Sequence, residues 1–463
     1  MVQQAVTQPM PRQHLTLIGI IGACCLWLPE EMALGLSANG GHGLSSSGYP
    51  LFLIAATIAT CGLLATRTEI LRARRGLVAF CSASQATGTL AMLVSLHLSL
   101  PLSCFALATA IAGIGFGLLS LAWGEFFADI PLRDIKRIMF GTALLQGALS
   151  TTLSLLPQLN AAVAMLPLAS GLILKRISAE SQAFGIEEAR LPRGSIRLPV
   201  LFSLGIAAMS VGRGSMVALS RGLALPSSLL SQVAISLFSI VVLWTLLFAA
   251  KRLDYTPAWR VISTIMITSF ITLASFGNDQ IDTAALVTDF GYALFEYIVW
   301  IASIDVARYS AHAPVRFIAF TAVFTFGGQC LGASATNAAL LSLGPSGVTI
   351  IAGIMASLLV FSVIWLAPSE AVSQLFALSE GRTKAPANPS GLGTLIERFG
   401  LTARELDVAE LLASGRSARF IQDQLNISES TTWTHIRHIY QKMGVSNRQA
   451  FLTLMEEIAQ GEK

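Results

Sequence analysis

Charged residues are scarce in this sequence. Asp, Glu, Lys and Arg make up 12% of its 463 residues, whereas a soluble domain usually contains about 25%. Apolar residues make up 54%, and the mean hydropathy is +0.67. The polar residues that remain are concentrated in short gaps between hydrophobic runs and in the C-terminal part of the chain. This distribution excludes an ordinary soluble protein and predicts a membrane region followed by one small soluble domain.

Cysteine pairs and catalytic motifs are also missing. The six cysteines lie in or beside apolar runs and form no C-x-x-C pair, so the sequence supports neither a zinc site nor a disulfide framework. It contains no H-E-x-x-H and no G-x-S-x-G motif. Gly113, Gly115 and Gly117 do not have the spacing of a phosphate-binding loop, and within an apolar run they predict close helix packing. We therefore expect no enzyme activity, no metal and no cofactor.

Twelve apolar runs have about the twenty residues that a helix needs to cross the hydrocarbon core of a membrane. The first six lie at residues 15–36, 49–66, 76–97, 100–122, 137–155 and 158–175. The other six lie at residues 198–218, 228–250, 258–276, 283–305, 316–342 and 346–368. The longest gap between them separates the two sets of six. We therefore predict an all-α protein with a 6+6 transmembrane bundle over residues 1–368.

The basic residues of the loops orient this predicted bundle. Lys and Arg collect on cytoplasmic loops. If the N-terminus is inside, the inner loops and their edges contain eighteen of these residues, and the outer loops contain Arg221 alone. An even number of spans then places both termini in the cytoplasm, where DNA is found. The pattern predicts a multi-pass protein of the bacterial inner (cytoplasmic) membrane, with the lipid bilayer as its surroundings.

Two sets of six spans joined by a longer cytoplasmic loop resemble the major facilitator superfamily of transporters. The loop at residues 67–76 keeps the basic charge of the motif that this superfamily has between spans two and three. It lacks the leading glycine and the aspartate of that motif. The resemblance implies a pocket between the two halves, and the departure leaves open whether the region transports anything.

Ionisable residues inside membrane spans are rare and usually functional, so they mark a candidate site for a small-molecule ligand. Arg213 lies in the seventh span, and Asp289 and Glu296 lie seven residues apart on one face of the tenth. Glu30 and Glu31 lie at the outer end of the first span. One carboxylate can pair with Arg213 and leave the other for a ligand or a proton. The alternative is a structural ion pair that fixes two helices, with water reaching the remaining acids.

A compact helical pattern follows the polar, proline-containing stretch 369–393, which we interpret as a linker. Residues 402–405 form a capping box at the start of a first helix, and Gly415 ends that helix. A helix–turn–helix pair follows, whose second helix runs from about residue 429 to residue 443. Another capping box, at residues 446–449, starts a fourth helix. The C-terminal part therefore has the layout of a small DNA-binding domain.

The second helix of the predicted helix–turn–helix has two different faces. Its apolar face, which should pack against the domain core, carries four residues at i, i+3, i+4 and i+7: Ile436, Ile439, Tyr440 and Met443. On the polar face, Arg437 can bind guanine with two hydrogen bonds, and Thr434 can touch a thymine methyl or a base edge. Hydroxyls in the first turn can hold phosphate. Six residues are candidate contacts to promoter DNA: Thr431, Thr432, Trp433, Thr434, Arg437 and Lys442.

Four short stretches of this segment follow a known pattern: L-T-A-R-E at 401–405, L-L-A-S-G at 411–415, I-S-E-S-T at 427–431 and I-Y-Q-K-M-G-V at 439–445. They resemble the LuxR/FixJ/GerE type of helix-turn-helix domain over about residues 395–457, within a domain that we place at residues 394–463. The resemblance implies DNA binding, generally by dimers, with the positions of Trp433, Thr434 and Arg437 facing the bases. The first of these three positions is usually Lys in the family, so Trp433 removes a positive charge.

The charge of the C-terminal part is unusual for a DNA-binding domain. From residue 393 onward there are eight basic and nine acidic residues, a net charge of −1. DNA affinity grows with the number of phosphates neutralised, so one domain alone should bind weakly, and a homodimer on DNA would compensate. The sequence predicts a one-component transcriptional regulator embedded in the membrane, which senses a small molecule and binds promoter DNA. Two alternatives stay open: a transporter with a regulatory DNA-binding domain, and a membrane-tethered protein-interaction module.

Overall fold

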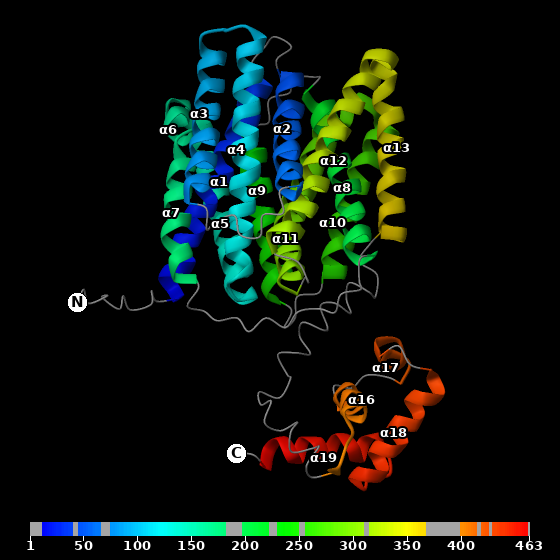
Figure 1. Ribbon diagram of the computed structural model, residues 1–463. Helices are drawn as coiled ribbons and strands as arrows, with labels where there is room; N and C mark the ends of the chain where they lie inside the picture. The colour runs from blue at the N-terminus through cyan, green and yellow to red at the C-terminus, as the bar shows by residue number, and fades with distance from the viewer. Residues whose placement is uncertain are drawn as a thin grey trace, which may run out of the picture. The chain divides into compact units, whose positions relative to one another are not determined.

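The computed structural model describes residues 12–39, 45–65, 75–181, 197–221, 229–249, 255–309, 314–366, 399–413, 418–425 and 428–461. All regular elements in these ranges are helices, as the sequence predicts, and none of the described residues is in a strand (Figure 1). The chain divides into an N-terminal unit, Met1–Gln374, and a C-terminal unit, Leu375–Lys463. The predicted linker at 369–393 lies outside the described residues. Each unit is therefore described by itself.

The N-terminal unit is a bundle of long helices in two halves. The first half contains α1 (Arg12–Asn39), α2 (Ser45–Ala65), α3 (Arg75–His97), α4 (Leu102–Ala128), α5 (Leu132–Leu155), α6 (Asn160–Val163) and α7 (Leu166–Ser181). The second half contains α8 (Arg197–Arg221), α9 (Leu229–Trp244), α10 (Tyr255–Phe276), α11 (Ile281–Tyr309), α12 (Pro314–Leu343) and α13 (Gly347–Phe361). Each predicted span overlaps one of these helices, except that α6 and α7 share the sixth.

Not all of these helices are both long enough and apolar enough to be identified as membrane spans. Seven stretches of the described residues are long and apolar enough to cross a membrane, and three more apolar helices are shorter. One of the seven stretches, Pro257–Ala307, runs through both α10 and α11. The helices therefore support a multi-pass membrane region, while the number of twelve crossings stays a prediction.

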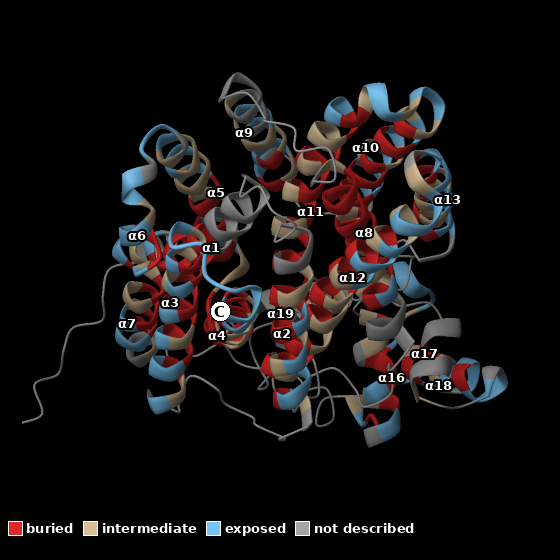
Figure 2. Cartoon of the chain, turned by 90° about the horizontal axis from the view of Figure 1, so that it is seen from above, coloured by how far each residue is buried: buried red, intermediate tan, exposed pale blue. Residues whose placement is uncertain are grey.

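Large apolar side chains cover much of the outside of this unit. Leu341 is 89% exposed and Leu172 is 69% exposed. Figure 2 shows that buried residues lie mainly on the helix faces that look toward one another, with exposed residues on the outer faces. An apolar surface of this extent is typical of a protein whose outer face contacts lipid.

Glycines allow several pairs of helices in the bundle to approach closely. A Cβ atom at Gly113, Gly115 or Gly117 of α4 would lie within 3.0 Å of the backbone of α2 or α3. A Cβ atom at Gly332 of α12 would lie 2.1 Å from the carbonyl oxygen of Val211 in α8. These contacts confirm the prediction that the α4 glycines serve helix packing.

The C-terminal unit contains α16 (Ala403–Ala413), α17 (Ala418–Leu425), α18 (Glu429–Met443) and α19 (Arg448–Gly461). They enclose one core, made of Leu401, Val408, Ala409, Leu412, Ile421, Ile436, Ile439, Met443 and Phe451. The predicted apolar face of α18 is confirmed, because three of its four residues are in this core and Tyr440 packs against it. The Ser428 hydroxyl caps the start of α18, and Gly444 ends it in the left-handed conformation.

Candidate DNA-binding face and membrane polar network

The capping box at the start of α16 is confirmed by its hydrogen bonds. The backbone N–H of Thr402 donates to Oε2 of Glu405 over 2.8 Å, and the N–H of Glu405 donates back to the Thr402 hydroxyl over 3.3 Å. The two bonds satisfy two helix-terminal donors at once. The box therefore fixes where α16 begins relative to the helices that pack on it.

Lys442 of α18 is bound to the same carboxylate. Its Nζ donates to Oε2 of Glu405 over 2.6 Å and to the carbonyl oxygen of Gly400 over 3.0 Å. Burial would raise the pKa of the Glu405 carboxyl, but the hydrogen bonds from Lys442 and Thr402 outweigh burial and lower this pKa to about 2. The ammonium group therefore joins α18 to the start of α16. This placement gives Lys442 a structural role, and because its side chain is 34% exposed, its contact with DNA stays a prediction.

Thr432 is a predicted DNA contact that the structure places inside the domain. Its side chain is completely buried, and its hydroxyl donates to the carbonyl oxygen of Ser428 over 3.0 Å. A buried hydroxyl that bonds the preceding turn of its own helix cannot reach a phosphate. The polar residue type suggested exposure at this position, but the helical register turns Thr432 toward the inside of the domain.

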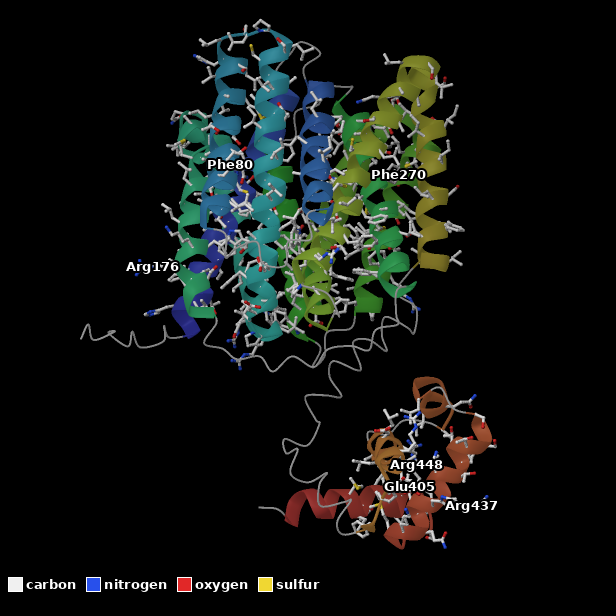
Figure 3. The ribbon with its side chains drawn as sticks, in the orientation of Figure 1. Phe80, Arg176, Phe270, Glu405, Arg437 and Arg448 are labelled. Atoms are coloured by element: carbon white, nitrogen blue, oxygen red, sulfur yellow. The ribbon has the colours of Figure 1, made fainter. Side chains whose placement is uncertain are left out.

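Four more predicted DNA contacts lie on the exposed side of α18. Thr431, Trp433, Thr434 and Arg437 are all exposed, and the Trp433 side chain keeps 53% of its accessible surface. In Figure 3 Arg437 points away from the C-terminal unit, whereas Glu405 lies inside it. An exposed helix face with a guanidinium, a hydroxyl and an aromatic ring has the groups that read base edges in a major groove. Their contact with DNA stays a prediction.

In the N-terminal unit, Arg213 and Asp289 form an ion pair between α8 and α11. The guanidinium carbon of Arg213 also lies 5.5 Å from the centre of the Tyr292 ring. The Arg213 side chain is 24% exposed and the Asp289 side chain is 45% exposed. Because a charged group facing lipid is costly, we interpret this exposure as contact with a water-accessible space inside the bundle.

A chain of uncharged polar residues extends this ion pair across the bundle. The Gln329 side chain of α12 donates to the Tyr292 hydroxyl over 2.7 Å and accepts a hydrogen bond from the Tyr49 hydroxyl of α2. The network therefore connects the two halves of the N-terminal unit. Tyr49, Tyr292 and Gln329 were not predicted as site residues, because they carry no charge that would mark them within an apolar span. The sequence does contain one indication of Tyr292, because it follows Asp289 by three positions and therefore lies on the same helix face.

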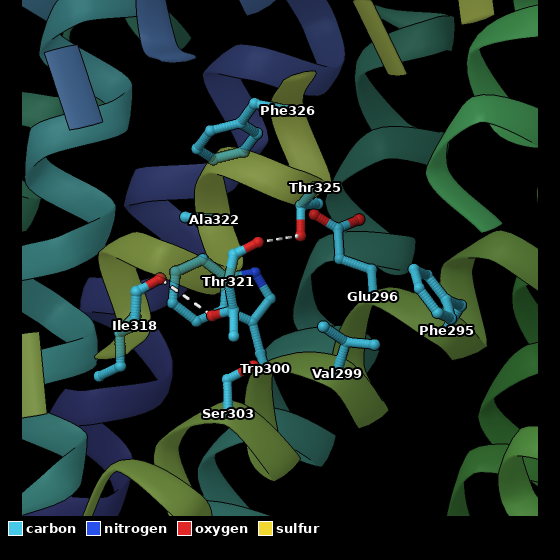
Figure 4. Close-up of a pocket in the computed structure, with 10 residues that line it drawn as sticks. All are labelled: Phe295, Glu296, Val299, Trp300, Ser303, Ile318, Thr321, Ala322, Thr325 and Phe326. Carbon is cyan, nitrogen blue, oxygen red and sulfur yellow. Dashed lines mark hydrogen bonds between the residues drawn. The ribbon is translucent and has the colours of Figure 1, made fainter. Parts of the chain in front are cut away.

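Glu296 lies one turn further along α11 and lines a pocket between α11 and α12 (Figure 4). The other residues that line the pocket are Phe295, Val299, Trp300, Ser303, Ile318, Thr321, Ala322, Thr325 and Phe326. The predicted candidates Arg213, Asp289 and Glu296 thus share one region of the bundle. Glu30 and Glu31 fall within α1, but their side chains lie outside the described part of the chain.

Comparison with known proteins identifies the C-terminal unit. Residues 400–455 match the luxR family of bacterial regulatory proteins. This segment is a LuxR-type DNA-binding domain. The HTH-type transcriptional regulator MalT of Klebsiella pneumoniae is 40% identical over 70 residues, which are 15% of this chain. The chain spans 8% of the length of that relative. The LuxR-type domain therefore implies a role in transcription regulation, and the similarity to MalT extends no further.

The N-terminal unit is similar to solved transporters. A bacterial homologue of the iron transporter ferroportin has a TM-score of 0.56, with 13% identity over 77% of this chain and 98% of that chain. The major facilitator superfamily symporter XylE of E. coli has a TM-score of 0.55, with 13% identity over 76% of this chain and 94% of that chain. The human organic anion transporter MFSD10 has a TM-score of 0.53, with 14% identity over 78% of this chain and all of that chain. At these identities the similarity shows a fold like that of the major facilitator superfamily.

Proposed function

We propose that this protein is a one-component transcriptional regulator whose N-terminal unit senses a small molecule from within the membrane. In this proposal the unit lies in the cytoplasmic membrane with both chain termini in the cytoplasm, and the LuxR-type domain binds promoter DNA as a homodimer. The chain acts by binding and by movement, and it catalyses no reaction. The observation that carries the proposal is the combination, in one chain, of a LuxR-type domain and a transporter-like bundle.

The proposed DNA binding is supported by the difference between the two sides of α18. Its buried side holds the core and Thr432, and Lys442 links it to Glu405, while its other side exposes Trp433, Thr434 and Arg437. Arg437 can place two donors on guanine, which is the commonest specific contact in a major groove.

The sensing half is supported by contacts between the two halves of the N-terminal unit. Trp300 of α11 makes an edge contact with Trp27 of α1, with the ring centres 5.9 Å apart, and the Tyr49–Gln329 hydrogen bond joins α2 to α12. A ligand that disturbs these contacts would shift the equilibrium between arrangements of the halves, provided that it binds them with different affinities. The shift would reach the LuxR-type domain through α13 and the residues that follow it.

Substitutions at Arg437 test the DNA-binding half. We would select binding sequences in vitro with the purified full-length protein and then measure its affinity for them. Because a bidentate guanine contact contributes about 1–3 kcal/mol, Arg437→Ala should weaken binding by roughly 5- to 150-fold. Arg437→Lys keeps the charge but loses the planar fork, so it should lose sequence preference and retain general DNA affinity. Unchanged binding in both variants would contradict the assignment of Arg437.

A second candidate function is a transporter that also regulates, and the paired charges inside the bundle favour it. Uptake of a bound ligand into vesicles that contain the protein separates the two functions, because a pure sensor binds its ligand without accumulating it. The interaction-module alternative predicts that the selection in vitro yields no preferred DNA sequence.

A further inference from the structure

The pocket between α11 and α12 has a chemical character that limits what it can bind. Its wall contains one carboxylate, Glu296, together with the rings of Phe295, Trp300 and Phe326 (Figure 4). Among the described residues, none of those that line it is basic. The pocket therefore combines a negative charge with aromatic surfaces.

The hydroxyl groups of the pocket add acceptors to this wall. The Thr321 hydroxyl donates to the carbonyl oxygen of Ile318 over 3.0 Å, and the Thr325 hydroxyl donates to the carbonyl oxygen of Thr321 over 3.1 Å. Because each hydroxyl hydrogen is used within α12, the two oxygens can offer only lone pairs to a ligand. The Ser303 hydroxyl is different: it is 98% buried and has no hydrogen-bond partner within the described structure. A buried polar group of this kind needs an explanation, and a bound ligand supplies one.

The charges around the pocket also favour a cation. Arg213 forms its ion pair with Asp289 and does not line the pocket. A cationic ligand beside Glu296 would be attracted by the carboxylate and by the aromatic rings.

We propose that this pocket binds a small organic cation, an ammonium group attached to an apolar or aromatic body. The ammonium group lies against Glu296 and the hydroxyls, and the body lies between Trp300 and Phe326. The proposal rests on the proposed sensing function and names the class of its ligand.

The position of the pocket explains how such a ligand would act on the rest of the bundle. Trp300 touches Trp27 of α1, and the Phe326 ring lies 5.7 Å from the ring of Phe116 in α4. The two aromatic walls are thus in contact with the first half of the N-terminal unit. The pocket is tight in this structure, so a ligand that enters must displace at least one of these rings. Binding would therefore change a contact between the two halves.

Three probes with the same body but different charge test the proposal. They are 2-phenylethylammonium, the neutral 2-phenylethanol and the anion phenylacetate. Binding to the full-length protein in lipid nanodiscs would be followed by tryptophan fluorescence and by the melting temperature. We expect saturable binding of the cation, roughly tenfold tighter than that of the alcohol, since a desolvated ion pair and cation–π contacts add to the shared apolar term. Phenylacetate should bind most weakly.

Two variants of α11 control this experiment. Glu296→Gln should remove the advantage of the cation over the alcohol, while Asp282→Asn, the same change of charge at an exposed position of α11, should keep it. Equal binding of cation and alcohol, an advantage that persists in Glu296→Gln, or no saturable binding of any probe would overturn the proposal. If the protein regulates its promoters but shows no preference for the cation, only this site assignment fails. If it prefers the cation but its promoters never respond to a ligand, the sensing function fails and the site remains.

Discussion

The two units of this protein use charged residues in opposite ways. In the N-terminal unit, Arg213 and Asp289 lie inside the bundle and pair with each other across two helices. In the C-terminal unit, the buried Glu405 pairs with the partly exposed Lys442 and fixes the scaffold, and Arg437 stays exposed. The difference reflects the surroundings: a bundle in lipid has no water at its surface to hold charges. Charge therefore marks a candidate site on the inside of one unit and on the outside of the other.

Breaking the ion pair inside the bundle should have the largest effect. Arg213→Ala leaves Asp289 without its cation, and for a pair that is half-buried we expect a loss of about 2–4 kcal/mol in the free energy of unfolding. The double variant Arg213→Met/Asp289→Leu removes both charges and should recover most of this loss. Denaturant unfolding in nanodiscs measures both. If the double variant is as unstable as the single one, the pair is not what holds α8 against α11.

The pair of Glu405 and Lys442 should make the stability of the C-terminal unit depend on pH in the acid range. The pKa of Glu405 is about 2 in the folded domain against an ordinary value of 4.5, so the carboxylate binds its proton less readily when folded. Its contribution to the free energy of unfolding is complete above pH 4.5 and is lost as the pH falls toward 2, on the order of 3 kcal/mol in total. Circular dichroism of residues 375–463 in denaturant, measured over this pH range, checks it.

The matched variant for this experiment is Lys442→Ala. It should destabilise the domain at neutral pH and reduce the loss of stability between pH 4.5 and 2. The DNA affinity of the folded fraction should stay near that of the unchanged protein. Weaker DNA binding with unchanged stability would show that Lys442 acts as a DNA contact and not as part of the scaffold.

Alanine substitutions of glycines test whether the close approach of helices stabilises the N-terminal unit. In Gly332→Ala the added Cβ would meet the backbone of α8 at 2.1 Å, so the helices must separate, at a cost of about 1–3 kcal/mol. Gly353→Ala in α13 makes the same change where no atom lies within 4 Å. Melting temperatures in nanodiscs should fall for the first variant and stay constant for the second. Equal behaviour would mean that close approach of α8 and α12 does not limit stability.

The smallest effect is expected on the exposed face of α18. Trp433→Lys adds a positive charge at 53% exposure, and we expect DNA affinity to rise a few-fold, with the slope against salt steeper by about 0.9 for each new phosphate contact. Thr453→Lys adds the same charge on the exposed side of α19. If both variants raise affinity equally, the gain comes from net charge and not from the position of residue 433.

Local patterns in the sequence predicted much of both units. Hydropathy located the membrane helices, and the capping box at 402–405 and the apolar spacing of α18 located the C-terminal ones. The contacts that the sequence did not predict join distant positions. Lys442 pairs with a carboxylate 37 positions away, and the hydrogen bond of Gln329 with Tyr49 spans 280 positions. A sequence does not show which helices of a bundle touch, so neither partner could be predicted.

Genome-wide footprinting of the tagged full-length protein, with Arg437→Ala as its control, tests the central claim most directly. The account predicts discrete peaks at promoters for the unchanged protein. It also predicts that these peaks disappear in the variant while membrane insertion and abundance stay the same. Peaks that persist in Arg437→Ala would contradict the role of the exposed face of α18. No peaks from an inserted and abundant protein, with or without the cationic probe, would contradict a membrane-embedded regulator that binds DNA.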